Sequence, residues 1–205
     1  MANRQYTTIE KLQNYLLIDI DVAFEAQVTE WIEYMSNYIE SQTGLVFIAD
    51  STASVKIYEV TDGGTDTIGD YTAEVVDLQI DDCVEVTELS IDDEVVDSAD
   101  YLIYPANAET KSRIHLTADS GLVFTEGEQN IEVTAKWGAT VAVPQDIEFA
   151  CTVLTAGIIN NNWESDGEVK SVTMGAYNLT FKDNKSVNDY ERAMEIIEIY
   201  NSISV

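Results

Sequence analysis

Basic residues, histidine, cysteine and proline are all scarce in this chain of 205 residues. Ten Lys and Arg stand against 38 Asp and Glu, so the formal net charge is -28 at pH 7. Such a surface repels phosphate backbones and anionic lipid, which argues against a protein that clamps nucleic acid or binds a membrane. The single histidine, His115, permits no histidine-rich metal centre.

The two cysteines, Cys83 and Cys151, are too few for a disulfide framework and lack the spacing of a metal site. We expect both to be small buried apolar groups in a reducing compartment, and a bridge between them is the less favoured alternative. The N-terminus lacks the apolar core of a secretory signal, and the longest apolar stretch, 147–159, is too short to cross a bilayer. Because 45% of the residues are hydrophobic, the chain is expected to fold despite its charge.

Helical periodicity dominates residues 1–44. Thr7 and Glu10 have the spacing of a capping box, which predicts a short helix ending near Leu17. A longer helix is expected to begin at Asp21 as N-cap and to stop at Gly44. We therefore predict a helical hairpin.

Between residues 45 and 143 the period changes from 3.6 to 2, which is typical of β structure. Turn signals separate six expected strands, near 55–61, 71–80, 84–91, 101–104, 112–117 and 130–137. A one-residue slip between Val86 and Leu89 indicates a β-bulge. The six short strands predict a small antiparallel sandwich or barrel-like domain.

The helical pattern returns in residues 144–205. Pro144 suits the first position of a helix whose apolar stripe ends at Asn160–Asn162. A β-hairpin around Gly175 follows over 169–181, and Asn188 with Glu191 predicts the start of a last helix. The fold class is therefore predicted to be α+β: a body of about four helices, formed by 1–44 and 144–205, with a β domain inserted at 45–143.

This order of elements resembles the head–tail connector (adaptor) proteins of long-tailed bacteriophages and related tailed viruses. The likeness covers nearly the whole chain, and four stretches carry it: TIEKLQNYLLID with FEAQVTEWIEYMSNYIESQTG, VTELSIDDEVVDSADYLIY, IEVTAKWGATVAVPQDIEFACTVLTAGII, and VKSVTMGAYNLTF.

The resemblance implies a structural virion protein of the neck, made in the host cytoplasm, and no enzyme. Its members form a ring, usually of twelve subunits, beneath the portal protein. The ring extends the DNA channel, through which the genome passes without sequence-specific binding, and it carries the tail or a stopper (tail-completion) protein. The C-terminal segment, here roughly 187–205, commonly docks against the portal.

The apolar last helix and the aromatic hairpin are sensible assembly surfaces, because each carries more apolar surface than one neighbour covers. Trp163 lies among polar residues and is a candidate interface anchor. The predicted interface residues are Trp163, Met174, Tyr177, Phe181, Tyr190, Met194, Ile197 and Tyr200. Trp31 and Trp137 lie on apolar faces and are assigned to the core.

No constellation for catalysis, cofactor binding or metal binding stands out. Asp62, Asp66 and Asp70 could offer oxygen ligands to Ca²⁺, but their spacing of four favours a solvated turn. The acidic groups at 81–85 and 92–94 could be drawn as paired carboxylates, and we assign them instead to hairpin tips. His115 is expected to face solvent on its strand. We predict no catalytic residue, no cofactor and no resident metal.

The charge is concentrated in the β region, where residues 50–110 hold 17 acids against one base, Lys56. Twelve such chains repel one another unless counterions screen the charge, and at roughly molar salt the Debye length is only ~3 Å. The composition therefore predicts rings that form in high salt and dissociate in low salt, as expected for a virus of a halophilic or marine host. The sequence leaves open whether the acidic domain faces the channel or the outside.

Two other functions remain as alternatives at this stage. One is a monomeric acidic β-sandwich binding module, with calcium dependence as a variant. The other is a carboxylate-based hydrolase that uses Asp81 or Asp82.

Overall fold

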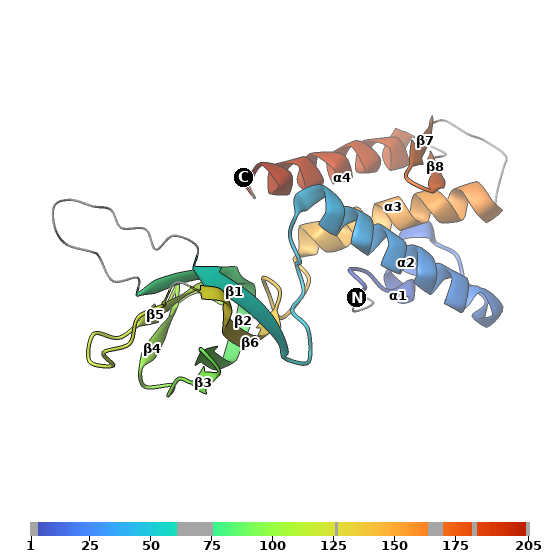
Figure 1. Cartoon of the computed structure of the whole chain (residues 1–205). Helices are drawn as coiled ribbons and strands as arrows, with labels where there is room; N and C mark the ends of the chain where they lie inside the picture. Colours follow the sequence, from blue (N-terminus) through green and yellow to red (C-terminus); the bar gives the residue numbers. More distant parts are fainter. Residues whose placement is uncertain (1–3, 61–75, 126, 164–169, 182–183, 204–205) are drawn as a thin grey trace. The chain divides into compact units, whose positions relative to one another are not determined.

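The computed structural model describes residues 4–60, 76–125, 127–163, 170–181 and 184–203. The chain divides into two compact units (Figure 1): a helical unit, Met1–Leu45 with Val143–Val205, and a β unit, Val46–Ala142. Helices fill the first and an antiparallel sheet the second, which confirms the predicted α+β class.

The helical hairpin consists of α1 (Ile9–Leu16) and α2 (Val22–Thr43). Asp21 caps α2 as predicted, because its carboxylate accepts a hydrogen bond from the Ala23 N–H at 2.9 Å, and Gly44 ends the helix at φ 69°. The predicted capping box was wrong by one residue, since Thr8 is the N-cap of α1 and accepts from the Lys11 N–H. Thr7 is buried instead, with its hydroxyl 2.6 Å from that of Thr152.

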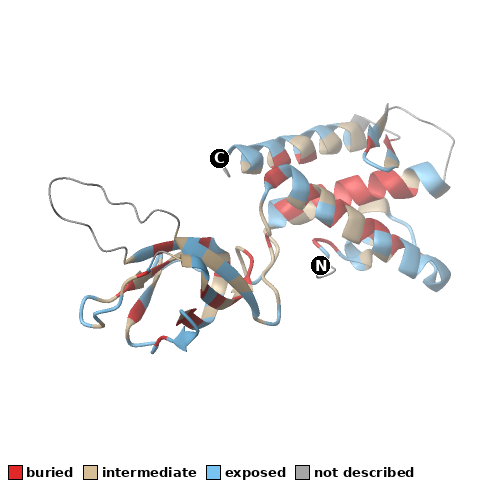
Figure 2. Ribbon diagram, viewed as in Figure 1, coloured by how far each residue is buried: buried red, intermediate tan, exposed pale blue. Residues whose placement is uncertain are grey.

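Helix α3 (Gln145–Trp163) is the centre of the helical unit. All residues from 150 to 159 are buried, so every face of this stretch is covered, and burial ends at Asn160. The sequence predicts only a single apolar stripe. Figure 2 shows this helix as the most continuously buried stretch of the unit. Its central residues are apolar or small, as expected for a helix surrounded by partners, and α1, α2, α4 and β8 all contact it.

The hairpin and last helix complete the helical unit. Strands β7 (Lys170–Met174) and β8 (Tyr177–Phe181) pair antiparallel, as predicted, and β8 packs on α3. Gly157 permits this close approach, because a Cβ there would lie 3.0 Å from the Leu179 Cβ. Helix α4 runs over Asn184–Ile203, so it begins four residues before the predicted Asn188; nothing in residues 184–187 breaks a helix.

The β unit is one six-stranded antiparallel sheet in the order β1-β6-β2-β5-β4, with β3 paired to β2. The strands are β1 (Ser54–Val60), β2 (Asp77–Ile91), β3 (Glu94–Val95), β4 (Tyr101–Tyr104), β5 (Lys111–Leu116) and β6 (Gly127–Trp137).

Two expectations for this sheet need correction. The segments 71–80 and 84–91 are not separate strands, because β2 runs unbroken from 77 to 91, while 71–75 lie outside the described residues. The predicted bulge is confirmed: the register with β6 shifts between Val86 and Glu88, and again between Cys83 and Glu85. The described strands form one sheet rather than a two-sheet sandwich, and β1 and β4 do not pair to close a barrel.

An apolar core packs against one face of the sheet. Buried residues from β2, β5 and β6 meet there, among them Leu89, Ile114 and Val133, each 0% exposed. Trp137 (4% exposed) lies in the same core and Trp31 (3%) in the helical one, which confirms their assignment. Both cysteines are free and buried, as predicted.

Candidate assembly surfaces

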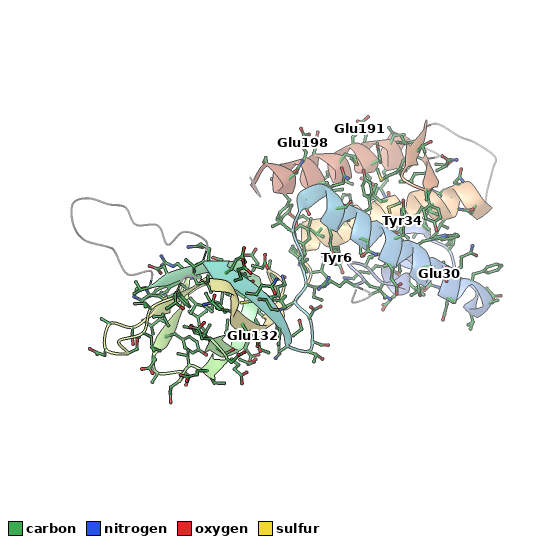
Figure 3. The ribbon with its side chains drawn as sticks, in the orientation of Figure 1. Tyr6, Glu30, Tyr34, Glu132, Glu191 and Glu198 are labelled. Carbon is green, nitrogen blue, oxygen red and sulfur yellow. The ribbon has the colours of Figure 1, made fainter. Side chains whose placement is uncertain are left out.

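The β7–β8 hairpin lies against the chain's own α2. The Ala176 N–H donates to the Tyr34 hydroxyl at 2.7 Å, and the rings of Tyr34 and Tyr177 meet edge to face with centroids 4.5 Å apart. Figure 3 labels Tyr34 on the helix that receives the hairpin. Met174 is 5% exposed. The turn that the sequence marks as an assembly surface is therefore held in place by the helical unit itself.

Helix α4 is fixed to its own unit at both ends. The Tyr15 hydroxyl donates to Asp189 at 2.9 Å, and the Tyr200 hydroxyl donates to Asp146 at 3.0 Å. Burial, and then the nearby Asp146 carboxylate, raise the pKa of Tyr200. The Tyr190 ring packs on Phe181 with centroids 4.7 Å apart.

The eight predicted interface residues therefore fall into three groups. Met174, Phe181 and Ile197 are buried within this chain. Tyr177, Tyr190, Met194 and Tyr200 are half-buried and keep surface for a partner. The side chain of Trp163, the last residue of α3, lies outside the described part.

A second apolar surface lies at the connection between α1 and α2, and the sequence reasoning missed it. Leu17 is 88% exposed and Val22 78%, with Phe24 at 45% and Ile18 at 37%. We call these four residues the α1–α2 tip. The run LIDIDVAF does not by itself mark this surface, because its Ile20 is buried (5% exposed) while Leu17 and Val22 on either side are not.

The acidic groups at 81–85 are not at a hairpin tip, contrary to the prediction. Asp81 lies within β2, where its carboxylate accepts from the Lys56 ammonium at 2.8 Å and from the Tyr58 hydroxyl at 3.0 Å. Burial acts to raise the pKa of Asp81, but these two hydrogen bonds outweigh it and hold the pKa below its usual value. Burial and the Asp81 charge raise the pKa of neighbouring Asp82. Only Asp92 and Asp93 occupy a turn, at φ 51° and 65°.

The remaining chemical candidates supply no catalytic arrangement within the described residues. No group of three or more His, Cys, Asp or Glu there could hold a metal ion, and Asp62, Asp66 and Asp70 lie outside them. His115 lies on β5 with a partly exposed side chain, and its Nδ1 is 3.1 Å from the Asp77 carboxylate. Burial raises the pKa of the Cys83 and Cys151 thiols to about 11, so neither is an activated nucleophile.

None of the helices described is both long and apolar enough to span a bilayer.

The β4–β5 hairpin is the part of the β unit with the least negative charge. Residues 101–116 carry Lys111, Arg113 and His115 against one acid, Glu109, whereas residues 46–100 carry 16 acids and one base. The Lys111 ammonium bonds the carbonyls of Pro105, Ala106 and Ala108 at 2.8, 3.2 and 2.6 Å, which orders the turn. A hollow of about 520 Å³ opens beside this turn, and none of the described residues that line it is acidic.

Together these features define the class of the chain: a helical body with an inserted acidic β unit. The last helix of that body is held by hydrogen bonds near both of its ends. No protein-family model and no curated protein sequence matches the chain. Solved structures that share its fold include three from gene transfer agent (GTA) particles.

The first is the neck of the native particle computed with C12 symmetry, with a TM-score of 0.52, 14% identity, and coverage of 94% of this chain and 86% of that chain. The second is the neck of the empty particle computed with C6 symmetry, with a TM-score of 0.55, 14% identity, and coverage of 93% and 87%. The third is the virion of the native particle, with a TM-score of 0.52, 19% identity, and coverage of 93% and 87%. The expected resemblance to neck proteins is therefore confirmed at the level of the fold.

Proposed function

We propose that this protein is a structural neck component of a tailed, virus-like particle: a head–tail adaptor that forms a ring, of twelve subunits, beneath the portal. The observation that carries the proposal is the extent of the likeness. Over nine-tenths of this chain, and more than four-fifths of each neighbour, share one fold that combines the helical body with the inserted β unit. The neighbours are parts of necks computed with C12 and C6 symmetry.

In this proposal the ring extends the DNA channel and binds the portal on one side and the tail or a stopper protein on the other. Genome DNA passes without being held, because a protein with a net charge of -28 repels the phosphate backbone. The partly exposed side chains of α4, among them Tyr190, Met194 and Tyr200, are the surface proposed for the portal.

Light scattering on the purified chain tests this proposal across a salt series. We expect a 22.8 kDa monomer at low salt and a particle of about twelve times that mass at roughly molar salt, because screening shortens the Debye length to ~3 Å. A chain that stays monomeric at every salt and protein concentration contradicts the ring and favours a monomeric binding module.

A further inference from the structure

The α1–α2 tip is built in a way that works against the stability of the isolated chain. Leu17 adopts φ 58° and ψ 40°, a left-handed conformation that costs any residue with a Cβ and that usually selects glycine. Its side chain is also 88% exposed, so it recovers no burial energy in return. A partner surface that covers Leu17 would explain why a large apolar residue stands in this position.

The charge of the tip restricts what that surface can be. Asp19, Asp21 and Glu25 lie among the apolar residues, and no Lys or Arg occurs between Lys11 and Lys56. A partner surface for the tip must therefore offer apolar contacts and positive charge together, since like charges at a contact cost several kcal/mol.

The β4–β5 hairpin has that combination. Leu102 is 48% exposed, and the described residues that line the hollow beside the turn include Tyr104 and Arg113 and no acid. The Arg113 guanidinium lies over the Tyr104 ring, 4.9 Å from its centroid. Its Nε is 3.5 Å from the Asp77 carboxylate, which partly neutralises its charge. Lys111 adds a second cation to the hairpin: it donates to three backbone carbonyls and lies at a neighbouring hollow that Asp50, Glu85 and Glu109 also line.

We propose that, in the ring of the proposed function, the α1–α2 tip of one copy docks on the β4–β5 hairpin of the neighbouring copy. Each copy carries one α1–α2 tip and one β4–β5 hairpin. The contact therefore joins two different surfaces, which makes it heterologous. Contacts of that kind close into rings when the rotation allows. In a molecule that is acidic elsewhere, this pairing is also one that avoids like-charge repulsion.

Disulfide trapping between singly substituted chains tests the contact directly. A Leu17→Cys chain is mixed with an Ala106→Cys chain at low salt, assembled at high salt and oxidised; Cys83 and Cys151 are 0% exposed and do not compete. We expect a covalent dimer of the two different chains, which can arise only between copies. The matched control replaces Ala106→Cys by Ser98→Cys, an exposed position outside the hairpin. Equal yields from both mixtures would overturn the proposal.

Charge exchange gives a second, independent readout. Asn107→Glu adds an acid to the hollow and is expected to reduce the assembled fraction at least threefold, while Ser98→Glu, with the same added charge, leaves it unchanged. Asp19→Lys in the Asn107→Glu chain is expected to restore assembly. If Asn107→Glu and Ser98→Glu behave alike, the hairpin is not the docking surface.

Leu17→Gly separates assembly from folding. The glycine removes the left-handed strain, so we expect the monomer at low salt to melt about 2–4 °C higher. The same change removes the apolar contact, so we expect assembly at high salt to weaken. If the ring forms normally with Leu17→Gly, this contact is wrong and the proposed function stands; if the unaltered chain never forms a ring, both fall.

Discussion

At the scale of single residues, the Tyr34 hydroxyl fixes the turn of the β7–β8 hairpin. It accepts from the Ala176 N–H at 2.7 Å, and a Cβ on Gly175 would overlap the same oxygen. Gly175 also adopts φ 57°, which favours glycine. Gly175 therefore permits both the conformation of the turn and its close approach to α2.

A double-mutant cycle measures that contact. Gly175→Ala is expected to lower the free energy of unfolding by about 2 kcal/mol, because it adds backbone strain and a steric clash. Tyr34→Phe is expected to cost about 1 kcal/mol for the lost hydrogen bond. In the Tyr34→Phe background the clashing oxygen is gone, so Gly175→Ala should cost about 1 kcal/mol less than in the unaltered chain. Strictly additive effects in chemical denaturation would contradict the contact.

Two adjacent carboxyls on β2 are predicted to act in opposite directions on stability. The pKa of Asp82 is raised in the folded chain, so its contribution is favourable at acid pH and is lost as the pH rises from the unfolded to the folded pKa. The pKa of Asp81 is lowered, so its contribution is present above the unfolded pKa and is lost as the pH falls through the folded pKa.

Asp82→Asn should therefore raise the melting temperature at pH 7, and Asp81→Asn should lower it. Both differences should shrink when melting is measured near pH 3. Each variant serves as the control for the other, since both remove one negative charge from neighbouring positions. Equal shifts of the same sign would show that net charge, rather than the local partners Lys56 and Tyr58, decides the outcome.

Residue roles could be predicted from the sequence where periodicity assigns a face. Trp31, Trp137 and both cysteines are buried because each lies on an apolar stripe or face. The partners of Asp81 could not be predicted, since Lys56 and Tyr58 approach it from a strand more than twenty residues away. The sequence predicts Leu17 only as the end of a helix, because its exposure depends on packing that no local pattern encodes.

At the scale of elements, most bounds follow from local signals and the exceptions have physical causes. Strand β2 was divided in two because its alternation slips, yet the bulges absorb the slip and the ladder to β6 continues. Helix α3 was assigned one apolar stripe, but its other faces carry Ala, Thr and Gly, which are small enough to be buried against neighbours. The three hydrogen bonds by which the Lys111 ammonium holds the β4–β5 turn have no sequence signature.

That turn gives the prediction at the element scale. Lys111→Ala removes the ammonium that joins the carbonyls of Pro105, Ala106 and Ala108. We expect amide hydrogen exchange in residues 105–112 to accelerate at least tenfold while the rest of the β unit keeps its protection. The control is Lys136→Ala, whose ammonium bonds Glu85 on β2 at 2.6 Å. Unchanged exchange at the turn in the Lys111→Ala chain would contradict its tethering role.

At the scale of the whole molecule, the net charge of -28 is unevenly distributed, with -16 in residues 50–110. Self-association must overcome the repulsion between copies, so it needs screening and a contact that places little acid against acid. The helical unit keeps the half-buried side chains of α4 on its surface, and the β unit keeps one hairpin with net positive charge. These surfaces are consistent with a subunit of a ring.

Electron microscopy of the purified chain at roughly molar salt tests the ring most directly. We predict class averages of closed rings with an axial opening and twelve-fold symmetry, which disappear when the salt is diluted. Single particles of 22.8 kDa, or open filaments without closure at any salt concentration, would contradict it.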